Sequence, residues 1–265
     1  MGEFNSASCG GISGISDTFG ATMWALDYVP QLASVGFDGA YIHTRERGIS
    51  YNLFDPPAAN DSSANWTTLP TFYALLPVAE ALGSQNGFFV MDLNINDNSD
   101  DSVAAGYGVY DGQTNALNTM VLFNYADTGK DAATFPMPSG VTKATLLVRL
   151  LTAASLIEKF NISWAGKTFE GVGDGIMVDS GYGPDQRILC DSGCENQAPS
   201  PGIVVVWLDS DDTFKEPTPS STSSTLGPSC TKTNGNIALP KSPSHPDSLQ
   251  MSLVIAFSIY VILYI

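Results

Sequence analysis

The residues able to carry acid–base or nucleophilic chemistry are sparse and gather towards the N-terminus. Glu3 offers a carboxylate that can attack as a nucleophile or transfer a proton, although a glutamate so near a chain end is ordinarily a solvated charge. His43 and Tyr51 can each donate a hydrogen bond to an anion. Alternatively, His43 is an ordinary loop residue and the ring of Tyr51 packs in the interior. Asn5 can bond to Glu3 or to a ligand, or to the backbone of its own turn. These four side chains form the candidate site.

The cysteines and histidines predict a disulfide and no metal site. Cys190 and Cys194 are separated by three residues, and the histidines are His43 and His245. This is not the spacing of a metal-binding cysteine pair, and ligands of the ordinary types are too few. We therefore expect no metal or other cofactor, and a Cys190–Cys194 disulfide that closes a hairpin turn.

The charge and the sequons indicate a secreted product that does not bind nucleic acid. The formal net charge is −16, and the sequence has no basic run that would attract phosphates. Three sequons, beginning at Asn60, Asn65 and Asn161, are candidates for glycosylation. Together with the expected disulfide they favour an oxidising, extracellular environment.

The C-terminal residues predict attachment to a membrane. Residues 251–265 carry no charged side chain, and a spacer rich in Ser, Thr and Pro precedes them. This arrangement is typical of a GPI attachment signal, with Asn234 as a candidate site, or of a simple hydrophobic anchor. A GPI signal needs an N-terminal signal peptide, which residues 1–20 do not show, so we expect further sequence upstream and a location at the cell surface.

Hydrophobic periodicity predicts an α/β segment followed by strands. The first part should hold a strand–helix–strand–helix order with parallel strands; because two such strands cannot bury both faces of a parallel sheet, it looks like the end of a larger domain. The later strands alternate and are spaced as in a β-sandwich. The expected helices are Ser16–Gly36, with Ser16 or Asp17 as N-cap and Pro30 bending it, and Thr71–Leu82; the expected strands are Gly39–His43, Phe88–Leu93, Tyr107–Tyr110, Leu117–Tyr125, Thr142–Leu151, Arg187–Leu189 and Ile203–Leu208.

Residues 2–27 combine a glutamate, a small glycine-rich loop and a helix that opens with Ser-Asp-Thr-Phe. This order and spacing resembles the nucleophile segment of glycoside hydrolase family 79, the heparanase-like β-glucuronidases, and the resemblance extends over residues 2–209. The segments that carry it are Gly2–Ser6, Cys9–Gly11, Ser16–Phe19, Trp24–Asp27, Gly39–His43, Asn161–Phe169 and Pro201–Leu208.

The resemblance implies a fold of α/β plus all-β class. Residues 1–85 would be the last two βα units of a (β/α)8 catalytic barrel, and residues 86–209 an antiparallel β-sandwich. Residues 210–248 would form a Ser/Thr/Pro-rich linker, and residues 249–265 the hydrophobic tail. Glu3 would lie at the carboxyl end of the seventh barrel strand, where barrel enzymes place catalytic groups.

The resemblance further implies a retaining β-glucuronidase in which Glu3 is the nucleophile and Asn5, His43 and Tyr51 contact the substrate. The substrates would be glycans of cell walls or proteoglycans that end in glucuronate or 4-O-methylglucuronate. Retaining hydrolysis needs a second carboxyl group about 5 Å from the first. In this family it follows an asparagine, and no Asn-Glu dipeptide occurs in the sequence. We therefore expect a fragment that is inactive alone; the alternative is a non-catalytic surface protein that binds glycans or is vestigial.

Overall fold

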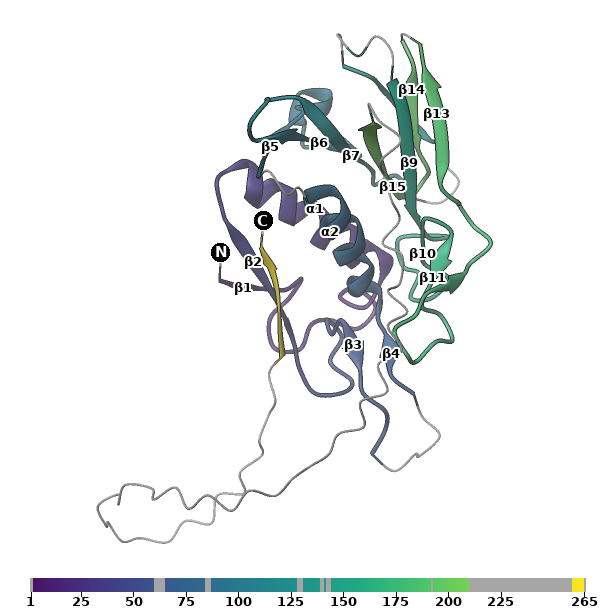
Figure 1. Cartoon of the computed structure of the whole chain (residues 1–265). Coiled ribbons are helices and arrows are strands. Elements are labelled where there is room, and N and C mark those ends of the chain that lie inside the picture. Colours follow the sequence, from purple (N-terminus) through teal and green to yellow (C-terminus); the bar gives the residue numbers. More distant parts are fainter. Residues whose placement is uncertain are drawn as a thin grey trace, which may run out of the picture. The chain divides into compact units, whose positions relative to one another are not determined.

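The computed structural model describes residues 2–59, 65–83, 87–127, 131–138, 141, 144–191, 193–209 and 259–264 (Figure 1). Residues Met1–Asp212 and Ala256–Ile265 form one compact unit. The expected linker, the sequon at Asn60 and the attachment candidate Asn234 lie outside the described residues. So do Cys230 and His245.

The N-terminal part is a parallel strand pair joined by a helix. Strand β1 (Glu3–Phe4) leads to helix α1 (Phe19–Ser34), and the chain returns as β2 (Gly39–Thr44). Glu3 is in register with Tyr41 and Phe4 with Ile42, and the two strands run parallel. The predicted strand–helix–strand unit is thereby confirmed.

Helix α1 begins later than the sequence predicts. Its N-cap is Thr18, which makes no capping hydrogen bond through its side chain. The expected cap residues are used within the preceding loop: Ser16 Oγ accepts the N–H of Ile12 at 2.9 Å, and Asp17 Oδ1 accepts the N–H of Gly14 at 2.6 Å. Their side chains therefore hold the loop, and the helix continues through Pro30 to Ser34.

The second helical pattern divides into two helices. A 3-10 helix, η1 (Pro70–Ala74), leads directly into α2 (Leu75–Leu82). Pro77 lies in the first turn of α2, where the backbone N–H groups have no partner within the helix. The proline is tolerated for that reason.

A large antiparallel sheet forms most of the remaining structure. In the described part it has nine strands in the order β12-β11-β10-β9-β15-β7-β6-β5, with β13 pairing with β9 as well. Two smaller pairs, β14 with β8 and β3 with β4, accompany it. The strand bounds are β3 (Phe54–Asp55), β4 (Thr67–Thr68), β5 (Phe88–Asp92), β6 (Ala104–Asp111), β7 (Leu117–Asn124), β8 (Ala133–Pro136), β9 (Ala144–Thr152), β10 (Ser163–Trp164), β11 (Lys167–Thr168), β12 (Val178–Asp179), β13 (Gln186–Cys190), β14 (Glu195–Ala198) and β15 (Gly202–Asp209); a further 3-10 helix, η2, spans Ile95–Asn98.

The large sheet is covered on both faces. On β15, Ile203 and Val205 belong to a core shared with α1 and α2, whereas Val204 and Val206 belong to a second core shared with β8 and β14. A strand buried on both faces needs apolar residues at successive positions, which explains the unbroken run Ile203–Val206. The result is a helical layer on one face of the sheet and a small β8–β14 sheet on the other.

The disulfide between Cys190 and Cys194 is present, but it does not close a hairpin. The strand before the turn, β13, pairs with β9, whereas the strand after it, β14, pairs with β8. The turn therefore carries the chain from one sheet to the other, and the expectation of a hairpin at this turn was wrong. Cys9 is exposed, and its thiol is free.

Part of the apolar tail forms a strand. β16 (Ile259–Tyr264) pairs antiparallel with β2, from Ile259 opposite Thr44 to Tyr264 opposite Gly39. β2 is thus paired with β1 along one edge and with β16 along the other. Within the described ranges, no helix is both long and apolar enough to cross a bilayer.

Candidate active site

The candidate site lies on one face of the β1–β2 pair. Phe4 is buried against Trp24 and Tyr28 of α1, with ring centroids 5.8 and 5.1 Å away. Because side chains alternate along a strand, the neighbouring Glu3 points to the opposite face. On β2 the buried residues alternate with partly exposed ones in the same way, so Tyr41 and His43 share that face with Glu3.

Glu3 and His43 are in direct contact across the parallel pair. The Glu3 Oε1 atom lies 2.6 Å from His43 Nδ1. The Glu3 side chain is 49% exposed and that of His43 only 14%. An ionised carboxylate can only accept hydrogen bonds, so the contact assigns the hydrogen to Nδ1. The buried imidazole therefore holds an accessible carboxylate in one position.

Asn5 binds the backbone of β2. Its Nδ2 donates to the carbonyl of His43 at 3.0 Å, and its Oδ1 accepts the N–H of His43 at 3.1 Å. These two bonds continue the strand pairing one step beyond β1. The side chain predicted to contact a substrate thus fixes the residue that contacts Glu3, with both ends of its amide engaged.

Tyr51 is brought to the site by the loop that follows β2. It is buried, and its ring centroid lies 6.1 Å from that of His43. Next to it, Asn52 accepts hydrogen bonds from the Thr44 hydroxyl and the Arg45 N–H and donates to Glu46 O and Asp55 Oδ1. This buried amide folds the loop back over the end of β2. Sequence reasoning missed Asn52, and its only signal was an asparagine in a glycine-containing loop.

The glycine-rich loop after β1 has a steric requirement for glycine. Gly11 adopts a φ of +80°, and a Cβ atom there would lie 2.9 Å from Ser16 Cβ and 3.2 Å from the ring of Tyr51. A larger residue would therefore push apart the loop, the start of α1 and Tyr51.

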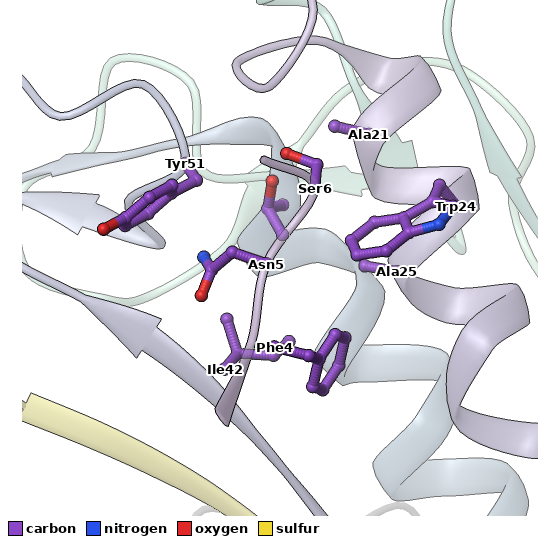
Figure 2. A pocket seen from close by; sticks show the side chains of 9 residues that line it. Phe4, Asn5, Ser6, Ala21, Trp24, Ala25, Ile42 and Tyr51 are labelled. Atoms are coloured by element: carbon purple, nitrogen blue, oxygen red, sulfur yellow. The ribbon is translucent and has the colours of Figure 1, made fainter. Parts of the chain in front are cut away.

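A small cavity lies behind the site, between Asn5, Trp24 and Tyr51. Figure 2 shows Trp24 and Ala21 from α1 on one side of it and Tyr51 on the other, with Asn5 and Ser6 between them. Its volume is only ≈ 10 Å³, about the space that one water molecule needs. A sugar ring cannot enter a cavity of this size.

The loop after β2 supplies the cationic side chains nearest to the site in sequence. Arg45 Nη2 pairs with Glu46 Oε1 at 3.1 Å, and Arg47 Nη1 donates to the carbonyl of Pro56 at 3.4 Å. All three side chains of the Arg45–Arg47 segment are thereby anchored locally. Among the residues that the structure describes, no group of three or more side chains is suited to hold a metal ion.

No protein-family model matches the sequence, and no match is found among curated proteins. Among solved structures, the chain is similar to a 4-O-α-L-rhamnosyl-β-D-glucuronidase from Fusarium oxysporum 12S, crystallised as a Rha-GlcA complex. The sequence identity is 26% and the TM-score 0.60, and the match covers 78% of this chain and 42% of that one. The described fold is therefore glycoside-hydrolase-like.

Two further structures match at lower similarity. An α-L-arabinofuranosidase from Thermotoga maritima has 11% identity and a TM-score of 0.45, covering 71% of this chain and 38% of that one. A GH30 endoxylanase from Clostridium papyrosolvens C71 has 14% identity and a TM-score of 0.42, covering 79% and 41%. This chain spans less than half the length of each of these three structures.

Proposed function

We propose that this chain is the nucleophile-bearing part of a retaining glycoside hydrolase that acts on β-glucuronides. The observation that carries the proposal is the Glu3–His43 contact: an accessible carboxylate held at 2.6 Å by a largely buried imidazole from the neighbouring parallel strand. In this proposal residues 1–85 are the last two βα units of a catalytic barrel and residues 86–209 a β-sandwich. The similarity to a glucuronidase structure supports this proposal.

The proposed chemistry has two displacements. Glu3 attacks the anomeric carbon, the bond to the leaving oxygen breaks, and a covalent glycosyl–enzyme ester forms; water then cleaves that ester. A second carboxyl group must protonate the leaving oxygen and later deprotonate the water. Because the sequence has no Asn-Glu dipeptide, we propose that this group belongs to a barrel segment outside this chain.

Within the proposal, the residues of this chain position the nucleophile and meet the uronate. His43 orients the Glu3 carboxylate, and Asn5 fixes the backbone of His43. Tyr51, beside His43, is the proposed contact to the sugar, and the cationic Arg45 and Arg47 favour an anionic substrate over a neutral one. Secretion and glycosylation at Asn65 and Asn161 belong to the same proposal; membrane attachment of the tail does not, because Ile259–Tyr264 pair with β2 as β16.

Binding of a substrate fragment tests the site without requiring turnover. We expect methyl β-D-glucuronide to shift the NMR signals of His43 and Tyr51 and methyl β-D-glucoside to shift them far less. Tyr51→Phe, which removes one hydroxyl, should weaken glucuronide binding about threefold to tenfold. The exposed Tyr182 provides the control, Tyr182→Phe. Equal responses to the two glycosides, or equal loss in both variants, would contradict the proposed uronate site.

A second candidate function is glycan binding without hydrolysis. It is favoured by one observation: within the described ranges, the hydrogen-bond partner of the Glu3 carboxylate is His43, and no second carboxyl group contacts it. Glucuronide binding combined with failure of Glu3 to react with an activated glycoside would select this function.

A further inference from the structure

A second concave site lies outside the Glu3–His43 face. It is lined by the rings of Phe54, Trp66, Phe72 and Phe169 and by the loop that contains Gly173 and Asp174, and its volume is ≈ 280 Å³. Phe72 and Phe169 are called the floor of the pocket below, and the Phe54–Trp66 and Gly173–Asp174 segments its walls. This volume is close to the lower end of ligand sites, about 300 Å³. It has room for one small ring-shaped ligand.

The floor of this aromatic pocket is rigidly fixed. The Tyr73 hydroxyl accepts the N–H of Phe169 at 2.7 Å and lies 3.0 Å from Thr168 Oγ1. The ring of Phe169 also packs edge-on against Phe72, with centroids 5.4 Å apart. Because these contacts join η1 to β11, the floor is preorganised before any ligand arrives.

The two walls are in close contact at one point. A Cβ atom on Gly173 would lie 2.4 Å from Asn65 Cβ and 3.3 Å from the carbonyl oxygen of Trp66. Only a glycine lets the loop approach the segment before β4 so closely.

Trp66 presents a platform at the mouth. Its side chain is 47% exposed, although Phe54 packs against it at 5.6 Å with an angle of 65° between the rings. A partly exposed tryptophan at the mouth of a pocket offers a flat apolar surface to a ligand. The polar groups nearby are the hydroxyl of Thr68 and the exposed carboxylate of Asp174, whose Oδ1 accepts the N–H of Ile176 at 3.0 Å.

We propose that this aromatic pocket binds a single neutral pyranose ring, with the apolar face of the sugar on Trp66 and its hydroxyl groups on Asp174 and Thr68. A pyranose combines an apolar C–H face with a rim of donors, which the ring and the carboxylate match. Asp174 disfavours an anionic sugar. A quaternary ammonium ion would need several ring faces pointing to one centre; here Phe54 meets Trp66 edge to face, and Phe72 meets Phe169 in the same way.

The pocket lies at the same end of the molecule as the candidate active site. Phe54 follows Tyr51 by three residues in the loop after β2, and Figure 1 shows β3 and β4 beyond the carboxyl end of that strand. The sugar pocket stands independently of hydrolysis, because neither Glu3 nor His43 contributes to it.

Saturation-transfer NMR on the full chain tests the pocket. The probes are the methyl β-D-glycosides of galactose, glucose and xylose, compared with tetramethylammonium. We expect at least one neutral glycoside to bind and its ring C–H protons to receive the strongest saturation. Trp66→Ala should weaken binding about tenfold, and Trp66→Phe, which keeps a flat ring, less.

Two control variants separate this site from other surfaces and from the proposed active site. Phe89→Ala removes a comparably exposed aromatic ring, stacked on Tyr110 far along the sheet edge, and should leave binding unchanged. Glu3→Gln should also leave it unchanged, while impairing reaction at the candidate active site. Neutral-glycoside binding that is absent or insensitive to Trp66→Ala, or preferred binding of tetramethylammonium, would overturn the proposal.

Discussion

At the residue scale, the central feature is that Glu3, His43 and Asn5 have different structural roles. Glu3 is accessible, His43 is largely buried, and Asn5 is held by two hydrogen bonds to the backbone of His43. The position of the carboxylate therefore depends on an amide that does not touch it. This dependence explains why the polar residue Asn5 directly follows β1, which is only two residues long.

Replacement of Asn5 should destabilise the β1–β2 pair. Asn5→Ala removes two hydrogen bonds and leaves the half-buried N–H and carbonyl of His43 without those partners, so the free energy of unfolding should fall by about 1–3 kcal/mol. Denaturant unfolding measures this change. Ser8→Ala, at an exposed position in the same loop, is the control and should change the free energy by less than about 0.5 kcal/mol. Similar changes in the free energy of unfolding for both variants would show that the two Asn5 hydrogen bonds do not stabilise the β1–β2 pair.

The residue types of the site could be selected from the sequence, but not their contacts. Glu3 and His43 are forty positions apart in sequence, and only strand register brings them together. The amide of Asn5 suits a ligand and a backbone equally well, so the residue type alone could not decide which of the two it contacts. The Asn52 bonds depend on the path of a whole loop, which local propensity does not determine.

At the element scale, α1 is joined to the large sheet by a half-buried acid, Asp27. The Tyr107 hydroxyl of β6 donates to Asp27 Oδ1 at 2.7 Å, and Tyr125 lies beside the same carboxyl group. Burial raises the pKa of Asp27 above its ordinary value of 3.8, although the tyrosine hydroxyls partly oppose the shift.

Stability should therefore depend on pH through Asp27. Between pH 3.8 and the higher pKa of the folded state, the folded chain binds more protons than the unfolded one, so the free energy of unfolding decreases as the pH rises through this window. In Asp27→Asn, which keeps an acceptor for Tyr107, this decrease should be absent. Thermal melts from pH 4 to 7 measure it, with the exposed Asp100→Asn as control; parallel curves for wild type and Asp27→Asn would contradict the assignment.

A second junction joins α2 to β9 through Arg149. The guanidinium binds both oxygens of Asp185, at 3.1 and 2.8 Å, and Glu80 Oε2, while Glu80 Oε1 accepts the indole N–H of Trp164. Burial alone would lower the pKa of Arg149, but the two carboxylates outweigh it and raise the pKa. The cation is therefore an integral part of the junction.

Breaking this junction should be costly. Arg149→Met keeps the volume of the side chain but leaves Glu80 and Asp185 without their cation, and we expect the free energy of unfolding to fall by about 3 kcal/mol. The exposed Lys167–Asp179 pair is the matched control. Lys167→Met should lower the free energy of unfolding by less than about 1 kcal/mol. Denaturant titration compares them. Equal effects would show that Arg149 behaves as an ordinary surface charge.

The long strands were predictable and the short ones were not. Six predicted strands correspond to β5, β6, β7, β9, β13 and β15. Runs of buried apolar residues mark the longest of them, as in Val121–Phe123 of β7 and Ile203–Val206 of β15. The pairs formed by β8 with β14, by β10 with β11 and by β11 with β12 were missed. They have two to four residues each, too few for a period to be visible.

At the scale of the whole molecule, one sheet separates two cores. The helices and the β1–β2 pair contribute to the core on one face, and β8 and β14 close the other. The core that packs against this face of the large sheet therefore also packs against the β1–β2 pair that bears the candidate site. The sequence indicated the order of an α/β part and a strand-rich part, but not that both share this core, because sharing depends on long-range packing.

Labelling of Glu3 tests the account most directly. 2-Deoxy-2-fluoro-β-D-glucuronyl fluoride carries a leaving group that needs no proton, so reaction requires the nucleophile and a bound sugar but not the second carboxyl group. After incubation of the full chain, peptide mass spectrometry should find the fluoroglucuronyl ester on Glu3 and none in Glu3→Gln. An unmodified Glu3, or an ester on another carboxylate that persists in Glu3→Gln, would contradict its role as the nucleophile.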